Sequence, residues 1–144
     1  MKNNLLALLV VLTSTFAFAQ KQVTFGGVSG FGGEFTESSY GGYVTVDRVG
    51  VQYTYGYSGL FSSYTYTANS LLVTYRATSL NNNVGILLGA GPSQVTESSI
   101  YSYDVWQGAK ANFFAGVDVN YYLLNVRAGY SYVDGFQIGV GYSF

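Results

Sequence analysis

The stretch that decides the fold is Phe136-Gln137-Ile138-Gly139-Val140-Gly141-Tyr142-Ser143-Phe144, at the end of the chain. Its large apolar side chains fall at every second position, and a Gln, Gly or Ser fills each position between them. Because successive side chains of an extended strand point to opposite sides, this stretch predicts a strand with one apolar and one small or polar face. A half-buried strand of a soluble protein shows the same alternation. The rest of the chain must indicate what the apolar face contacts.

The composition limits the kinds of surface and chemistry that the chain can have. Charged residues make up 9% of the sequence, against about 25% in ordinary soluble domains, which predicts an outer surface that is not in water. The formal net charge of −1 and the lack of a basic cluster give no indication of nucleic-acid binding. There is no Cys and no His, which removes disulfides, thiolate nucleophiles and the commonest general base and metal ligand. We therefore expect no enzyme activity, no cofactor and no metal site.

The amino terminus has the pattern of a secretory signal peptide. Lys2 gives a positive start, residues 5–16 are uncharged and mostly apolar, and Ala17 and Ala19 supply the small-x-small pattern that signal peptidase recognises. A membrane-spanning helix is the competing interpretation, but it needs about 20 apolar residues. We predict a cleaved signal peptide over residues 1–19 and one domain over residues 20–144.

The remaining chain alternates with a period of two rather than with a helical period. No later segment is long and apolar enough for a transmembrane helix, and no long helical pattern has start and stop signals. Eight candidate strands follow from the alternation, at residues 22–32, 40–49, 51–58, 71–78, 84–91, 107–121, 125–133 and 136–144.

The connections between these strands predict an up-and-down order. Asp134-Gly135 is a favoured sequence for a two-residue type I′ hairpin, which would make the last two strands antiparallel neighbours. The other links alternate between short and longer ones, the longest being residues 59–70 and 91–106, so the long links share one end. An outer-membrane strand needs about 9–11 residues, which the chain length allows for eight strands. The prediction is an all-β fold, an eight-stranded antiparallel up-and-down transmembrane β-barrel.

The direction of the apolar faces follows from the residues between them. If the apolar faces pointed inward, a surface of Gly and little charge would meet water, and such a protein would be poorly soluble. If they point outward to lipid, small residues fill a barrel with room only for side chains. The charged residues of the strands then share the interior, where a pairing network would offset the cost of their burial. These residues are Asp47, Arg76, Lys110, Asp118 and Arg127. Some of them could instead lie near the barrel ends and be solvated.

The many aromatic residues agree with a membrane surface. Tyr and Trp favour the headgroup region of a bilayer, and several lie on the outward side of strands: Tyr53, Tyr75, Tyr121, Tyr130, Tyr142 and Phe144. Others lie in or beside the long links: Tyr64, Tyr66, Tyr101, Tyr103 and Trp106. For this second group, anchoring at the membrane interface and a recognition surface rich in Tyr and Ser both remain open.

At its carboxyl terminus the chain resembles the small outer-membrane β-barrels of Gram-negative bacteria, the eight-stranded OmpX/OmpA-like family. Gln137, Gly139, Tyr142 and Phe144 occupy the four defined places of that superfamily's assembly signal, polar-x-Gly-x-x-aromatic-x-aromatic. The resemblance implies a location in the cell outer membrane. It also implies outer-membrane lipid, lipopolysaccharide and the barrel-assembly machinery as partners.

The expected function is a structural or surface-interaction role in the outer membrane, with an interior plugged by side chains. One alternative is a narrow channel for small solutes, which would need the interior charges to line water. The other is a soluble periplasmic or secreted barrel that binds an apolar ligand.

Overall fold

The computed structural model describes residues 22–59, 64–79, 83–99 and 105–144, without the side chains at 78, 79, 105 and 106. The strands in these ranges are β1 (Val23–Phe31), β2 (Ser38–Val46), β3 (Val49–Ser58), β4 (Tyr64–Ser79), β5 (Val84–Ser99), β6 (Val105–Tyr121), β7 (Leu124–Ser131) and β8 (Gly135–Ser143). The predicted signal peptide, with Ala17 and Ala19, lies outside the described residues.

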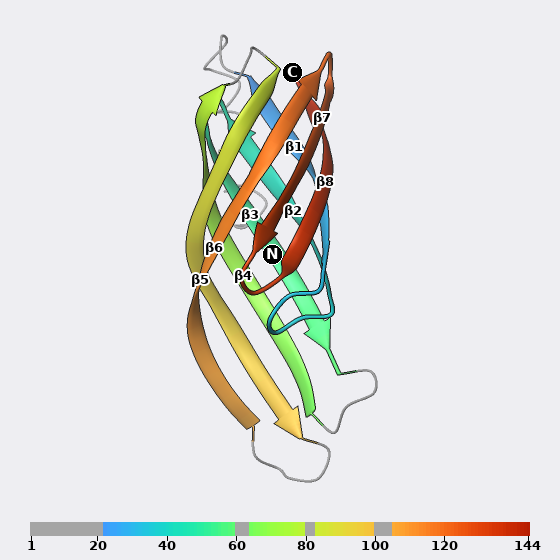
Figure 1. Ribbon diagram of the computed structural model, residues 1–144, viewed down its shortest axis with the longest axis vertical. Helices are drawn as coiled ribbons and strands as arrows, with labels where there is room; N and C mark the ends of the chain where they lie inside the picture. The colour runs from blue at the N-terminus through green and yellow to red at the C-terminus, as the bar shows by residue number, and fades with distance from the viewer. Residues whose placement is uncertain (1–21, 60–63, 80–82, 100–104) are drawn as a thin grey trace, which may run out of the picture.

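The strands form a closed barrel in sequence order, with antiparallel neighbours throughout (Figure 1). The first and last strands close it, with Phe25 opposite Tyr142. Beyond that pair, the backbone N–H of Val23 donates to the carbonyl of Phe144 at 2.8 Å, and the N–H of Phe144 donates to Val23 at 2.9 Å. The predicted eight-stranded antiparallel up-and-down fold is confirmed. Among the described residues, no helix has the length and hydropathy required to span a membrane.

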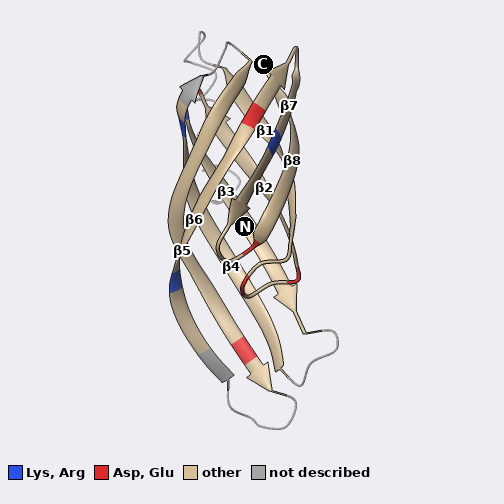
Figure 2. Cartoon of the chain, in the orientation of Figure 1, with Lys and Arg blue, Asp and Glu red and all other residues tan. Residues whose placement is uncertain are grey.

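The two faces of the barrel wall differ as the alternation predicts. Large apolar side chains point outward and are exposed, as at Phe113 (63%) and Val140 (54%). Every Asp, Glu, Lys and Arg within the described strands lies on the inward side of the alternation. Figure 2 shows how few charged positions the strands carry. The outward face of the described strands therefore carries no charged side chain that water would solvate.

Three strands are much longer than the other five. Strands β4, β5 and β6 have 16, 16 and 17 residues, whereas the others have 8 to 10. Figure 1 shows them continuing past the rest of the barrel at the end away from the C-terminus. We call the parts of these three strands nearest that end, residues 64–70, 93–99 and 105–113, the extended sheet; β4 remains paired with β3 as far as Tyr66.

The extended sheet corrects the predicted long links, because much of residues 59–70 and 91–106 is strand. Its outward face is polar on β4 and β5, where it includes Thr67, Asn69 and Gln94. On β6 the outward residues change from Phe113, Ala111 and Ala109 to Gln107. Polar residues on this face and mixed residues on the other remove the apolar alternation that marks a membrane strand. Thr, Val and Tyr still favour an extended backbone there.

The connection between β7 and β8 also differs from its prediction. The strands are antiparallel neighbours as expected, but the turn consists of Tyr132, Val133 and Asp134. Only Gly135 has positive φ, 76°, so the predicted two-residue type I′ turn, which needs two such residues, is wrong. Val133 and Asp134 instead point inward and are fully buried.

The β1–β2 loop packs against this turn. The Thr36 hydroxyl donates to the Val133 carbonyl at 3.3 Å, and the Glu34 N–H donates to the Tyr132 carbonyl at 3.3 Å. Val133 forms an apolar cluster with Ala68 and Val95 of the extended sheet. Loop and turn therefore fill the barrel end from which the extended sheet projects.

Candidate functional site

The buried carboxylate of Asp134 is the centre of a polar network in the barrel interior. Its Oδ2 accepts hydrogen bonds from Thr54 Oγ1 (3.0 Å), Asn112 Nδ2 (3.2 Å), Ser131 Oγ (3.3 Å) and Gln137 Nε2 (3.4 Å). Its backbone N–H donates to Ser131 Oγ at 3.1 Å. These donors come from strands on different sides of the barrel, so the carboxylate joins the walls to the turn.

Two glutamine amides connect this carboxylate to a guanidinium. Arg127 Nη1 donates to Gln52 Oε1 at 3.4 Å, and Gln52 Nε2 donates to Gln137 Oε1 at 2.6 Å. Gln137 Nε2 then donates to Asp134. All four side chains are at most 2% exposed. We call Arg127, Gln52, Gln137 and Asp134 the amide relay.

The Arg127 side chain packs against Tyr43 and Gly139 in the barrel interior. Its guanidinium carbon lies 3.4 Å from the centre of the Tyr43 ring, and its Nη2 donates to Thr45 Oγ1 at 3.1 Å. A Cβ on Gly139 would lie 2.7 Å from Arg127 Cγ and 3.1 Å from Tyr43 Cε1. The missing side chain at Gly139 is therefore what lets the two large groups stack in the interior.

A second charged pair lies nearer the end with the short turns. Arg76 Nε donates to Asp118 Oδ1 at 3.0 Å, with both side chains about one-tenth exposed. A Cβ on Gly85 would clash with the Arg76 side chain. Tyr43 donates its hydroxyl proton to Asn125 Oδ1 at 2.7 Å, and Asn125 Nδ2 donates to Asn120 Oδ1 at 2.7 Å. Polar contacts thus continue towards this end of the barrel.

The structure brings together three of the five charges that the sequence grouped as one interior network, because Asp118 forms an ion pair with Arg76 and lies directly opposite Arg127 on the neighbouring strand. Arg76 pairs with Asp118, and Arg127 lies in the amide relay. Lys110 is at the other end of the barrel, where its amine lies 5.7 Å from the centre of the Phe35 ring. Asp47 is exposed in the β2–β3 turn with φ of 58°, so its placement in the interior is wrong. Strand β2 ends one residue before it, because two residues there reverse the chain.

Sequence reasoning missed most of the neutral and turn residues of the network. Asp134 was placed in a hairpin turn, and no local pattern shows that its side chain enters the barrel. Gln52 and Gln137 lay on the polar side of their strands, which was the available signal. The sequence prediction placed only charged residues in the network. Buried amides such as those of Gln52 and Gln137 also need hydrogen-bond partners, so they belong in it as well.

The residues of the predicted assembly signal divide between the two faces of β8. Gln137 and Gly139 face inward and are buried, whereas Tyr142 and Phe144 face outward and are about half exposed. The Phe144 ring lies 5.8 Å from the Phe25 ring and 6.4 Å from the Tyr142 ring. The role of these residues in assembly stays a prediction.

The extended sheet has an open edge. Strand β6 pairs with β7 only from Phe114 to Tyr121, so residues 105–113 have no partner strand on that side within the described chain. Among the aromatic side chains at the inner side of the sheet, the Phe35 ring centre lies 6.5 Å from that of Tyr66 and 6.0 Å from that of Tyr132. An unpaired strand edge is a feature of surfaces that pair with other chains.

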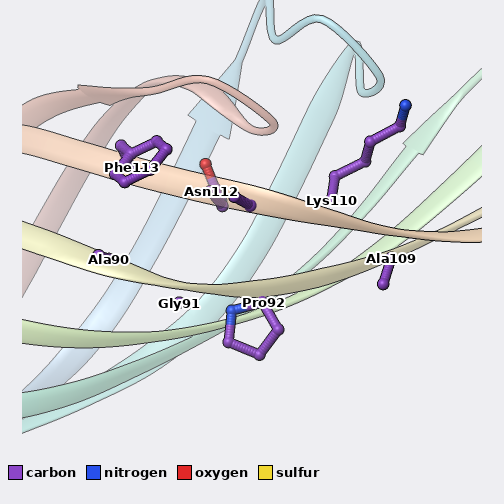
Figure 3. Close-up of a pocket in the computed structure, with 8 residues that line it drawn as sticks. Ala90, Gly91, Pro92, Ala109, Lys110, Asn112 and Phe113 are labelled. Atoms are coloured by element: carbon purple, nitrogen blue, oxygen red, sulfur yellow. The ribbon is translucent and has the colours of Figure 1, made fainter.

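A shallow hollow of about 430 Å³ lies where the extended sheet leaves the barrel (Figure 3). Figure 3 shows Pro92 and Ala109 on one side of the sheet and Lys110 pointing to the other. Beside this hollow the pairing of β4 with β5 is interrupted. Leu71 lies opposite Pro92 and Leu72 opposite Gly91, but neither pair is joined as the neighbouring pairs are. Proline has no N–H to donate, which accounts for the gap in the ladder.

Comparison with known proteins rests on structure. No family model matches the sequence, and neither does any curated protein. The N-terminal β-barrel domain of OprF from Pseudomonas aeruginosa matches with a TM-score of 0.58 and 18% identity, over 86% of this chain and 97% of that one. The outer-membrane protein Ail of Yersinia pestis, in a phospholipid bilayer nanodisc, matches at 0.54 and 15%, over 86% and 99%.

The fold is that of the small outer-membrane barrels. A crystal structure of Ail, the attachment invasion locus protein, also matches, with a TM-score of 0.51 and 18% identity over 86% of this chain and 97% of that one. At identities this low, the matches show a shared fold alone.

Proposed function

We propose that the chain is an integral outer-membrane barrel with a plugged interior, which holds the extended sheet outside the cell as a contact surface. The exposed apolar wall would be costly in water and is suited to lipid. The match to a barrel determined in a phospholipid nanodisc supports the same location.

One observation carries this proposal: the outward face changes character while the strands continue. On β4 it changes from Leu71 to Asn69, and on β5 from Pro92 to Gln94. Neighbouring strands make the change at nearly the same height, since Asn69 pairs with Gln94. A membrane boundary explains this change, because strand residues beyond the lipid no longer need an apolar outer face.

The polar network in the interior argues against the two alternatives. A channel needs continuous water, whereas side chains from several strands meet across this narrow barrel. A carrier of an apolar ligand needs an apolar cavity, whereas the buried interior is rich in Gln, Asn, Ser, Thr and Arg. We assign no enzyme activity. In the proposed arrangement the apolar wall contacts lipid and the extended sheet contacts the exterior.

The proposal includes the expected route and partners of the chain. Residues 1–19 would direct export, and Gln137, Gly139, Tyr142 and Phe144 would be recognised by the barrel-assembly machinery. Outer-membrane lipid and lipopolysaccharide would surround the apolar wall.

Single cysteines test the location and the orientation, because the native chain has no Cys. A charged, membrane-impermeant maleimide should label Gln107→Cys, on the extended sheet, in intact cells. It should label Arg48→Cys, in the β2–β3 turn, only after the outer membrane is permeabilised. Val140→Cys should stay unlabelled in both cases. Rapid labelling of Val140→Cys in folded protein would contradict a lipid-facing wall.

Planar-bilayer recording tests the plugged interior separately. Purified protein should give no stable discrete openings. Reproducible openings from folded, heat-modifiable protein would favour the narrow channel instead.

A further inference from the structure

The β6–β7 turn has an apolar tip at the end of the barrel that carries the C-terminus (Figure 1). Tyr121 pairs with Leu124, so Tyr122 and Leu123 form a two-residue turn between the strands. Tyr122 is 85% exposed, and Leu123 is about half exposed. Two-residue hairpin turns favour Gly, Asn and Asp. A tyrosine and a leucine at such a tip indicate an environment other than water.

The backbone of Tyr122 is strained as well. Within the described residues, Asp47 (φ 58°) and Tyr122 (φ 52°) are the residues other than Gly with positive φ. Asp tolerates this conformation, because its short polar side chain can hydrogen-bond to the local backbone, whereas a bulky side chain has a steric cost. Gly or Asn would form the turn with less strain. The tyrosine therefore indicates a role for the ring itself.

The turn on the opposite side of the barrel has a different character. The closed order of the strands places the β2–β3 turn across the barrel from the β6–β7 turn, at the same end. It consists of Asp47 and Arg48, and both are exposed. One turn is charged and suited to water, whereas the other is apolar. The two sides of this barrel end are therefore suited to different surroundings.

The apolar turn is continuous with the outward wall. The Tyr121 ring faces outward, and its centre lies 4.7 Å from that of Tyr122, with the rings nearly perpendicular. Leu124 pairs with Tyr142, whose ring centre lies 6.4 Å from that of Phe144. The headgroup layer of a bilayer suits tyrosine, because the apolar ring and the hydroxyl both find partners there.

We propose that the β6–β7 turn inserts into the headgroup layer of the periplasmic leaflet, with Tyr122 and Leu123 in contact with phospholipid. The β2–β3 turn stays in water. The bilayer then reaches further along the β6–β7 side of the barrel than along the opposite side, and the barrel axis is inclined to the membrane normal. The inference rests on the proposed location in the outer membrane. It adds a lipid contact beyond the last outward strand position, which a lipid-facing wall alone does not require.

Fluorescence quenching tests the depth of the two turns. Leu123→Cys and Arg48→Cys carry the same small fluorophore, in purified protein folded in phosphatidylcholine vesicles that contain no other protein. Iodide on both sides of the membrane should quench the label at residue 48 severalfold more strongly than the label at residue 123. A nitroxide on the glycerol region of the lipid should quench them in the reverse order. A high lipid-to-protein ratio keeps two copies of the chain from covering each other's turns.

A second variant assigns the insertion to the Tyr122 ring. Tyr122→Asp, made in the Leu123→Cys chain, gives this turn the residue that the β2–β3 turn has and relieves the backbone strain. Its carboxylate favours water over the headgroup layer, so iodide quenching at residue 123 should rise towards the level at residue 48. Tyr122→Trp keeps an interfacial ring and should leave the quenching as it is. If Tyr122→Asp does not fold, Tyr122→Asn replaces it.

The label on Val140→Cys separates failure of this inference from failure of the proposed location. Equal iodide quenching at residues 48 and 123, with Val140→Cys quenched by lipid nitroxides, would overturn the insertion and leave the membrane location intact. Unchanged protection of residue 123 in the Asp or Asn variant would overturn the role of Tyr122. A Val140→Cys label that iodide quenches and lipid nitroxides do not would contradict the location itself.

Discussion

At the scale of single residues, the amide relay explains how opposite charges coexist in a narrow barrel without touching. Each glutamine accepts on the side of Arg127 and donates on the side of Asp134. Both amide dipoles are therefore aligned with the field between the two charges. Such an arrangement lowers the cost of burial for both ions, provided that every link is made.

The relay predicts a specific cost for removing its central link. Gln52→Leu would leave Arg127 Nη1 without this acceptor and Gln137 Oε1 without its 2.6 Å donor. Loss of a partner from a buried polar group costs about 1–3 kcal/mol, so the free energy of unfolding should fall by about that amount. Urea unfolding in lipid vesicles measures it.

Gln94→Leu is the matched control, since Gln94 is exposed on the outward face of β5. The same change of side chain there should alter the unfolding free energy by less than about 0.5 kcal/mol. Equal losses for Gln52 and Gln94 would show that the interior amides carry no special weight.

At the scale of elements, the strand segments with an apolar outward face were predictable, whereas their continuation into the extended sheet was not. Residues 84–91 alternate clearly because one side of β5 is apolar and the other, apart from Leu87, consists of Gly. From Gln94 onward the same strand has Gln, Thr and Ser on its outward face, and the period of two in hydropathy disappears. The sequence therefore predicts a loop from Gln94 onward, although the backbone there continues to pair with β4 and β6.

The ladder gap at Pro92 predicts that a residue with an N–H would strengthen the β4–β5 pair. Pro92→Ala supplies the missing donor opposite Leu71, and one added hydrogen bond contributes about 0.5–1.5 kcal/mol. Unfolding free energy should rise, and amide exchange near Leu72 and Gly91 should slow. Exchange that is unchanged at both residues would show that the carbonyl of Leu71 is satisfied in another way.

Strand β8 combines barrel closure with a predicted assembly signal, and Phe144→Ala separates the two. The substitution keeps the backbone pair between Phe144 and Val23 and removes the ring. We therefore expect refolding in detergent to be retained while assembly in cells falls severalfold, measured as loss of the heat-modifiable band. Phe136→Ala, at the other end of β8, is the control with a similar loss of outward ring. Equal assembly of both variants would reject a special role for the terminal ring.

At the scale of the whole molecule, alternation and sparse charge were enough to predict closure, strand number and the outward apolar face. They could not predict the interior contacts, which depend on which residues meet across the barrel. Asp134 illustrates the limit: it contacts Thr54 and Asn112, which are 80 and 22 residues away. Asp47 shows the same limit for a strand end: β2 ends at Val46 rather than at residue 49, which moves Asp47 from the interior to an exposed turn.

The position of the bilayer along the barrel gives the last prediction. Val140 and Gln94 both face outward, but Val140 lies in the apolar wall and Gln94 on the extended sheet. An Arg on the lipid face of a barrel strand costs about 2–4 kcal/mol near the midplane and about 0–1 near the interface. Val140→Arg should therefore lower the free energy of unfolding in phospholipid vesicles by about 2–4 kcal/mol, and Gln94→Arg should change it little. If both variants lose the same unfolding free energy in vesicles, the bilayer also covers the extended sheet. The proposed contact surface would then lie within the membrane.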